Sequence, residues 1–223
     1  NKLSVLIGDF LLSKALINMI KLKDFDALEI ISITAEKLSA GEILQIEKSM
    51  TRSMDETTYF DMIGQKTSSL IATSCELGAI TTTKKEEDRK ATYEFGLNLG
   101  TAFQIKDDLF DITGSEFQTG KNSNSDVKKN MITLPIIYAK SKMTRIQKRR
   151  LGELLKRKNK NKKTILGIRE LIVEAGGIKY STNKMEEYSI RCNTSNTICP
   201  IKIILVKIRL QLYMFFHLYF IVF

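Results

Sequence analysis

The sequence predicts an all-α protein whose helices pack around a central cavity, as in bundles that build sites from facing helices. Three observations support this prediction. Apolar residues recur at helical spacing over most of the chain. The sequence holds only 2 prolines and 12 glycines, which favours long helices over frequent turns. No segment alternates apolar and polar residues as a strand does. With 223 residues, 43% of them hydrophobic, the chain suits one large domain with an ample core.

Two helices are predicted near the start of the chain. Apolar residues over positions 3–20 recur every three or four positions and define the first helix. Asp24 or Asp26 can cap the second helix, because an Asp side chain accepts hydrogen bonds from the free N–H groups of a first turn. We expect Gly41-Glu42 to interrupt this second helix briefly before its apolar pattern resumes.

A third helix is predicted to begin at Asp55 or Thr57 and to run to about Gly78. The turn 81–83 separates it from one long helix over residues 85–111. A single stripe of that long helix carries five residues at helical spacing: Tyr93, Leu97, Gly100, Gln104 and Asp108.

Helical character continues in the second half of the chain. Thr133-Leu134-Pro135 is expected to start a helix, because proline suits a first turn. Amphipathic segments follow to about Ala175, and Gly176-Gly177 then breaks the pattern. A short helix is predicted around residues 184–188.

Residues 189–223 differ in composition from the rest of the chain and are treated as a separate, divergent tail. Lys202, Lys207 and Arg209 interrupt its apolar run, and the uninterrupted stretch 210–223 is shorter than the roughly 20 residues that span a bilayer. We therefore expect no stable membrane span. The abrupt shift to Ile, Phe and Lys is interpreted as a shifted or degraded reading frame.

The charge is distributed unevenly along the chain. Residues 121–223 carry 22 Lys and Arg against 6 Asp and Glu, whereas residues 1–120 carry 13 against 19. A basic half could bind nucleic acid or a membrane surface. The densest basic segment, 156–163, contains no aromatic residue to stack on bases, and no nucleic-acid-binding motif surrounds it. We expect this segment to be a solvated loop between helices and expect no nucleic-acid partner.

The cysteines indicate a reducing compartment. Cys75, Cys192 and Cys199 are odd in number and form no Cys-x-x-Cys pair, which favours free thiols and a cytoplasmic location. Cys75 lies on an apolar face and is expected in the core. The single histidine, His217, has no ligand-like neighbours, so a zinc site is not supported.

The most informative motif is the carboxylate trio Asp107, Asp108 and Asp111 on the predicted long helix. Residues three and four apart share one edge of a helix, where like charges repel unless a cation neutralises them. Oxygen ligands without nearby His or Cys suit Mg²⁺, which takes one or two carboxylates together with water and phosphate oxygens. The alternative is a solvated acidic helix edge, which a short motif of this kind often is.

The segment after the trio supports the metal interpretation. The helix is expected to end at Thr113-Gly114, and a polar loop carries Lys121 directly after Gly120. A lysine placed there suits a diphosphate held between Mg²⁺ and a cationic side chain.

Three segments together resemble the trans-polyprenyl diphosphate synthases, the head-to-tail prenyltransferases. Residues 100–139, "GTAFQIKDDLFDITGSEFQTGKNSNSDVKKNMITLPIIYA", resemble the family's second aspartate-rich region. Residues 59–79 resemble its helix with a Lys-Thr pair, and residues 1–16 resemble its N-K-x-x-x-L-x-G-D helix. The order and spacing match over about residues 1–188, which we take as a partial polyprenyl synthase domain, so the isoprenoid-synthase-type bundle is expected to be incomplete.

The resemblance implies a reaction between two diphosphates. An allylic diphosphate ionises with help from Mg²⁺ and basic side chains, and the double bond of isopentenyl diphosphate then attacks. Asp107, Asp108 and Asp111 are implied to bind Mg²⁺. The other implied site residues are Lys66 and Lys121 on the diphosphate, Thr67 and Gln104 lining the same site, and Phe103 beside the isopentenyl pocket. From the residues alone, Lys66 could be a surface lysine, and Gln104 and Phe103 could be core residues. The resemblance also implies a homodimer.

Two departures from the family pattern bear on activity. The family's other D-D-x-x-D helix, with the Arg pair after it, has no counterpart in the sequence, so we expect an N-terminally truncated chain with impaired activity. Met131 stands where many family members carry a lysine. A non-catalytic or decayed family member therefore remains the alternative to an active synthase. A terpene cyclase and a nucleic-acid-binding protein are weaker alternatives.

Overall fold

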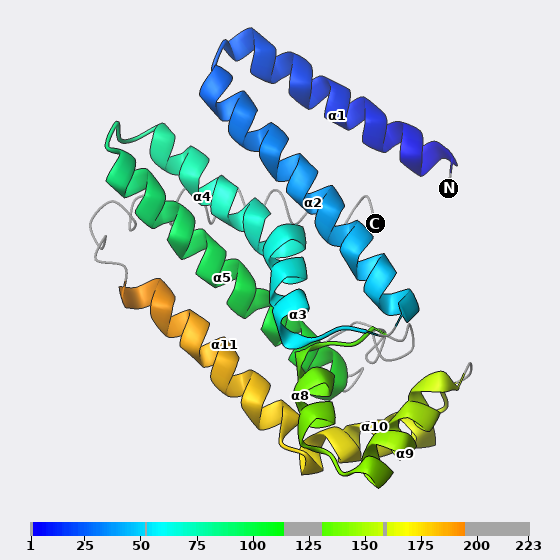
Figure 1. Ribbon diagram of the computed structural model, residues 1–223. Coiled ribbons are helices and arrows are strands. Elements are labelled where there is room, and N and C mark those ends of the chain that lie inside the picture. Colours follow the sequence, from blue (N-terminus) through cyan, green and yellow to red (C-terminus); the bar gives the residue numbers. More distant parts are fainter. Residues whose placement is uncertain (1, 52, 114–130, 158–159, 195–223) are drawn as a thin grey trace.

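The computed structural model describes residues 2–51, 53–113, 131–157 and 160–194, and every regular element in these ranges is helical. The predicted all-α class is therefore confirmed. Figure 1 shows the helices stacked side by side, with the N-terminal pair at one end and α8–α10 at the other. The elements are α1 (Lys2–Leu22), α2 (Phe25–Thr51), α3 (Glu56–Ile63), η1 (Gly64–Ser68), α4 (Ser69–Ile80), α5 (Glu86–Thr113), α8 (Leu134–Lys142), α9 (Arg145–Lys156), α10 (Lys162–Glu174) and α11 (Gly177–Thr194).

Capping side chains begin the helices where the sequence predicts them. Asp24 Oδ1 accepts a hydrogen bond from the Ala27 N–H at 3.0 Å, so Asp24 caps α2. Asp55 Oδ1 accepts one from the Thr58 N–H at 2.8 Å and caps α3. This backbone hydrogen bond lowers the pKa of the Asp55 carboxyl, because it stabilises the charged form.

The helix α5 is the centre of the fold, packed along α4 on one side and α11 on the other (Figure 1). Two glycines permit its close approach to α4 and η1. A Cβ on Gly96 would lie 2.6 Å from Ala72 Cα, and one on Gly100 would lie 2.6 Å from Ser68 Cα. The Cys75 side chain is fully buried beside this contact, as predicted, and burial raises the pKa of its thiol to about 12.

The helices α3 and α4 follow each other without a loop, joined by the π-helical turn η1. The turn η1 spans Gly64–Ser68 and holds Lys66 and Thr67. A π-helical turn widens the helix by one residue and often marks a functional site. The widened turn therefore falls on the Lys-Thr pair that the sequence singles out.

The expected interruption of the second helix at Gly41-Glu42 is wrong. The helix α2 runs without a break from Phe25 to Thr51. Gly41 is instead buried where α2 touches η1, and a Cβ there would lie 2.6 Å from the Lys66 backbone nitrogen. The glycine allows close helix packing rather than breaking the helix.

Replacing Gly41 with alanine should therefore destabilise the protein. The new Cβ meets backbone atoms of η1, which cannot move aside without shifting the turn, so we expect a loss of about 1–3 kcal/mol in unfolding free energy. Urea denaturation followed by circular dichroism measures it. Gly8→Ala in α1 is the matched control, because nothing lies within 4 Å of a Cβ there, and it should be neutral or stabilising. Equal stability of the two variants would contradict the packing role.

The predicted short helix near residues 184–188 is also wrong in extent. The helix α11 begins at Gly177 and runs to Thr194, beyond the expected end of the domain at residue 188. Gly176 adopts a φ of 77°, which makes the tight turn into α11. A Cβ on Gly177 would lie 2.3 Å from the Pro135 carbonyl oxygen, so α11 starts directly against α8. The rest of the tail, 195–223, lies outside the described residues.

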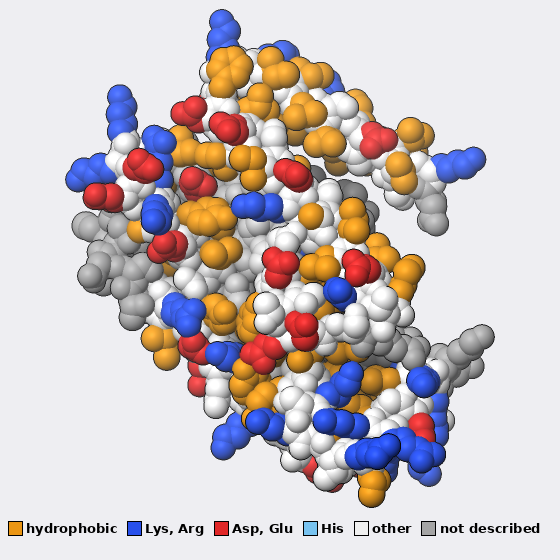
Figure 2. Space-filling view, in the orientation of Figure 1, with side chains coloured by type: hydrophobic (Ala, Val, Ile, Leu, Met, Phe, Trp, Pro, Cys, Tyr) orange, Lys and Arg blue, Asp and Glu red, His pale blue; other side chains and the backbone are white. Residues whose placement is uncertain are grey.

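The lysines of the basic segment 156–163 are not all exposed to solvent as predicted. Figure 2 shows Lys and Arg side chains gathered over α9 and α10. Lys160 in the connection between these helices is only 9% exposed, and its Nζ donates to the Arg157 carbonyl oxygen at 3.1 Å. The predicted solvated loop is therefore wrong for Lys160, because its side chain folds back onto the end of α9.

The helix α1 buries none of its residues and packs only against α2 among the larger contacts. Apolar side chains cover it (Figure 2), and Leu3, Phe10 and Ile17 are 70%, 59% and 48% exposed. By length and composition α1 meets the criteria for a membrane span, which core helices of soluble proteins and signal sequences also meet.

Candidate active site

A chain of hydrogen bonds joins the π-helical turn to α5. Thr67 Oγ1 donates to Gln104 Oε1 at 2.8 Å, and Gln104 Nε2 donates to Asp108 Oδ1 at 2.9 Å. Tyr59 of α3 donates its hydroxyl to Asp108 Oδ2 at 2.7 Å. The structure thus brings together three residues predicted for the site, and it adds Tyr59, which sequence reasoning missed.

The three carboxylates of α5 differ in their surroundings. Asp108 is only 3% exposed, whereas the Asp107 side chain is exposed and Asp111 is half-buried. A buried carboxylate is costly unless hydrogen bonds satisfy it, and Tyr59 and Gln104 supply one to each oxygen of Asp108. Asp108 therefore orients the Gln104 amide, while Asp107 and Asp111, four residues apart, share the accessible edge of the helix.

The carboxylates of α5 supply part of the ligand set that a hard cation such as Mg²⁺ needs. Among the residues that the structure describes, no group of three or more His, Cys, Asp or Glu could hold a metal ion. Asp107 and Asp111 offer carboxylate oxygens, and Mg²⁺ commonly takes one or two carboxylates with water and substrate phosphates completing its shell. The residues therefore fit a Mg²⁺ ion that a phosphate helps to bind.

Two side chains of α2, those of Glu42 and Gln45, contact the Lys66 ammonium. Its Nζ lies 2.6 Å from Glu42 Oε2 and also donates a hydrogen bond to Gln45 Oε1. Gln45 Nε2 in turn points to Met131 Sδ at 3.9 Å. Lys66 is partly exposed and paired with a glutamate, as a surface lysine can be, so its role at the diphosphate stays a prediction. Glu42 and Gln45 were not predicted for the site, because only the packing of α2 on η1 brings them to Lys66.

Two remaining site predictions have different outcomes. Phe103 is 44% exposed, so it is not a core residue, and its place beside an isopentenyl pocket stays a prediction. Lys121 lies outside the described residues. Lys66 and Thr67 share the π-helical turn, and Thr67 contacts Gln104 of α5. A single site that joins Lys66 to Asp107 and Asp111 stays a prediction.

Comparison with known proteins decides the family. The model of the family described as "Polyprenyl synthetase" matches residues 1–172. The chain belongs to the polyprenyl synthetase family. The resemblance inferred from the three sequence motifs is thereby confirmed, and the helices described above are those of a polyprenyl synthetase.

Individual relatives agree with this assignment. Decaprenyl-diphosphate synthase of Dictyostelium discoideum is 34% identical over 193 residues, which is 86% of this chain and 40% of that protein. Solanesyl diphosphate synthase 3, chloroplastic/mitochondrial, of Arabidopsis thaliana is 39% identical over 139 residues, covering 62% of this chain and 33% of that protein. The present polyprenyl synthetase chain thus spans well under half the length of these two relatives.

Solved structures confirm the isoprenoid-synthase type of bundle. A polyprenyl synthase from Caulobacter crescentus, complexed with calcium and isoprenyl diphosphate, superimposes with a TM-score of 0.80 at 28% identity. The match covers 87% of this chain and 59% of that chain.

Proposed function

We propose that this chain is part of a polyprenyl diphosphate synthase, a prenyltransferase that condenses isopentenyl diphosphate with an allylic diphosphate. The observation that supports this most is the Thr67–Gln104–Asp108–Tyr59 hydrogen-bond chain, which joins the turn bearing Lys66 to the helix bearing Asp107. A cation and a carboxylate edge on facing helices suit a metal-bound diphosphate. The Caulobacter crescentus relative is described with calcium and isoprenyl diphosphate bound, which agrees with this proposal.

The proposed reaction uses the protein for positioning and charge stabilisation. The C–O bond of the allylic diphosphate breaks, and its electron pair leaves with the diphosphate. The double bond of isopentenyl diphosphate attacks the allylic carbon, and a proton is then lost. Lys66 and Lys121 bind the diphosphate in this proposal, Thr67 and Gln104 line it, and Phe103 flanks the isopentenyl group. No protein nucleophile is required.

The carboxylate trio takes two roles in this proposal. Asp107 and Asp111 would hold Mg²⁺, which when bound neutralises charge on the leaving diphosphate. Asp108 serves as a positioning residue, since both its oxygens already accept hydrogen bonds within the fold. The role of Asp108 as a third Mg²⁺ ligand, which the resemblance implies, stays a prediction, because each carboxylate oxygen keeps a second lone pair.

A non-catalytic or decayed family member is the second candidate. It is supported by Met131, which lies against Gln45 where a lysine was expected. A lysine at position 131 would place a second ammonium beside the Lys66–Glu42 pair. Turnover assays, described below, separate the two candidates. The absence of a nucleic-acid partner stays a prediction.

We propose that the chain works in a reducing compartment. The relatives include a protein named as chloroplastic or mitochondrial. The expected cytoplasmic location stays a prediction, and the free thiols of Cys75 and Cys192 suit any reducing compartment.

We further propose that α1 and α2 pack against a second copy of the chain. The exposed apolar stripe of Leu3, Phe10 and Ile17 spans two full heptads of α1. A stripe of this length needs burial, and a homodimer interface supplies it symmetrically.

Charging the stripe should break the dimer. Phe10→Glu with Ile17→Glu should convert a dimer to a monomer, because two carboxylates would be buried without partners. Light scattering after size-exclusion chromatography gives the mass. Lys21→Asp with Lys2→Asp is the control for charge on the same helix and should leave a dimer. A wild-type monomer at high concentration would contradict the proposal.

A further inference from the structure

The Lys66 ammonium is paired with a carboxylate of α2, the helix that packs against η1. Glu42 Oε2 lies 2.6 Å from Lys66 Nζ, and Gln45 Oε1 accepts a second hydrogen bond from the same ammonium. Close packing of α2 on η1 places these groups, since a Cβ on Gly41 would lie 2.9 Å from Lys66 Cβ. The two acceptors are three residues apart and share one face of α2.

The two acceptors differ in charge, and this decides their behaviour toward an anionic ligand. A diphosphate on Lys66 brings negative oxygens next to the Glu42 carboxylate, and like charges at that separation repel. Gln45 is neutral and loses nothing when a phosphate arrives. Its amide is also anchored at the other end, where Nε2 points to Met131 Sδ.

Displacement of Glu42 is inexpensive. Its side chain is 52% exposed and that of Lys66 is 35% exposed, so water screens the pair. Ion pairs of this kind contribute little net stability, whereas a metal-bound diphosphate offers several charged oxygens at once. Glu42 can turn into solvent when such a ligand binds.

Building on the proposed diphosphate site, we propose that Glu42 is a built-in competitor that occupies Lys66 until a diphosphate displaces it, while Gln45 stays in place and orients the ammonium. A singly charged anion gains too little from Lys66 to replace a carboxylate of equal charge. Glu42 thus raises the charge that a ligand needs in order to bind, and it favours diphosphates over weaker anions.

A single isosteric substitution tests this. Glu42→Gln keeps the acceptor on Lys66 but removes the competing charge, so inorganic pyrophosphate with Mg²⁺ should bind the full chain about two- to fivefold more tightly. Isothermal titration calorimetry measures the affinity. The gain should be largely lost in the Lys66→Met background, because no ammonium is left to compete for.

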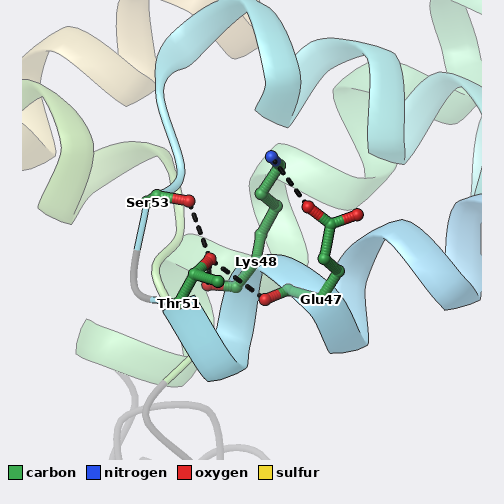
Figure 3. Close-up of polar contacts among 4 residues, drawn as sticks. All are labelled: Glu47, Lys48, Thr51 and Ser53. Atoms are coloured by element: carbon green, nitrogen blue, oxygen red, sulfur yellow. Dashed lines mark hydrogen bonds and ion pairs between the residues drawn. The ribbon is translucent and has the colours of Figure 1, made fainter.

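The matched control lies five residues further along α2. Glu47 pairs with Lys48 rather than Lys66, with Glu47 Oε1 and Lys48 Nζ 3.2 Å apart (Figure 3). The Glu47 side chain is 58% exposed, close to the value for Glu42. Glu47→Gln makes the same change in net charge and should leave pyrophosphate affinity unchanged.

The outcomes separate the inference from the function on which it rests. Tighter binding by Glu42→Gln alone, lost without Lys66, supports the competitor role. If Glu42→Gln binds as weakly as wild type or more weakly while Lys66→Met abolishes binding, Glu42 is no competitor and the diphosphate site stands. If Lys66→Met binds as well as wild type, both the site and the inference are overturned.

Discussion

The 223-residue chain alone should condense allylic and isopentenyl diphosphates very slowly or not at all. Its sequence contains one D-D-x-x-D motif, so it can stabilise the leaving diphosphate from one side only. Losing one preorganised electrostatic contact commonly costs about 10²–10³ in rate. Here a carboxylate set, an Arg pair and the lysine expected at position 131 are all missing. We therefore expect a deficit well beyond that of a single contact, though not a simple product.

Incorporation of radiolabelled isopentenyl diphosphate measures this turnover. Fusing a segment with a second D-D-x-x-D motif and its Arg pair ahead of Asn1 should restore product formation, and Asp107→Asn in the fused chain should abolish it again. Robust product formation by the 223-residue chain would show that the other D-D-x-x-D helix of the family and its Arg pair are dispensable.

Asp108→Asn should destabilise the fold by about 1–3 kcal/mol, whereas Asp107→Asn should leave stability nearly unchanged. The Asp108 oxygens accept hydrogen bonds from Tyr59 and Gln104. An Asn amide in its place keeps only one acceptor oxygen for two buried donors, so the Tyr59 hydroxyl or the Gln104 amide loses its acceptor. Asp107 is exposed, so its substitution leaves no such buried clash.

Urea titration of both variants gives the difference in unfolding free energy. Ligand binding should show a different pattern from stability. Asp107→Asn should weaken Mg²⁺-dependent pyrophosphate binding without lowering the urea midpoint of unfolding. Tyr59→Phe should destabilise less than Asp108→Asn, since it removes one donor without creating a clash. Equal stability of Asp107→Asn and Asp108→Asn would contradict the division of roles within the trio.

The fold was predictable because its main signals are local. Helical spacing of apolar residues, the cap at Asp55 and the proline at position 135 each act within one or two turns, and the structure confirms them. Gly41 was misjudged because a glycine within a helix resembles a break unless its neighbour in space is known, and here that neighbour is Lys66 of η1. The extent of α11 was misjudged for another reason: its start against Pro135 of α8 depends on tertiary packing.

The contacts among Thr67, Gln104 and Asp108 agree with the predicted site, but the surroundings of each carboxylate could not be predicted from the sequence. Spacing places Asp107, Asp108 and Asp111 on nearby positions of one helix and cannot say which of them is buried. That depends on Tyr59 and Gln104, which reach Asp108 only through tertiary packing. The pairing of Lys66 with Glu42 and Gln45 likewise depends on how α2 crosses the π-helical turn.

The central claim is that Lys66 and the Asp107–Asp111 edge form one metal-dependent diphosphate site. Calorimetric titration of the chain with inorganic pyrophosphate, with and without Mg²⁺, tests it most directly when wild type is compared with Lys66→Met and with Asp107→Asn/Asp111→Asn. The account predicts binding that requires Mg²⁺ and that each of these variants weakens at least tenfold. Binding that persists unchanged without Mg²⁺, or that survives in both variants, would contradict it.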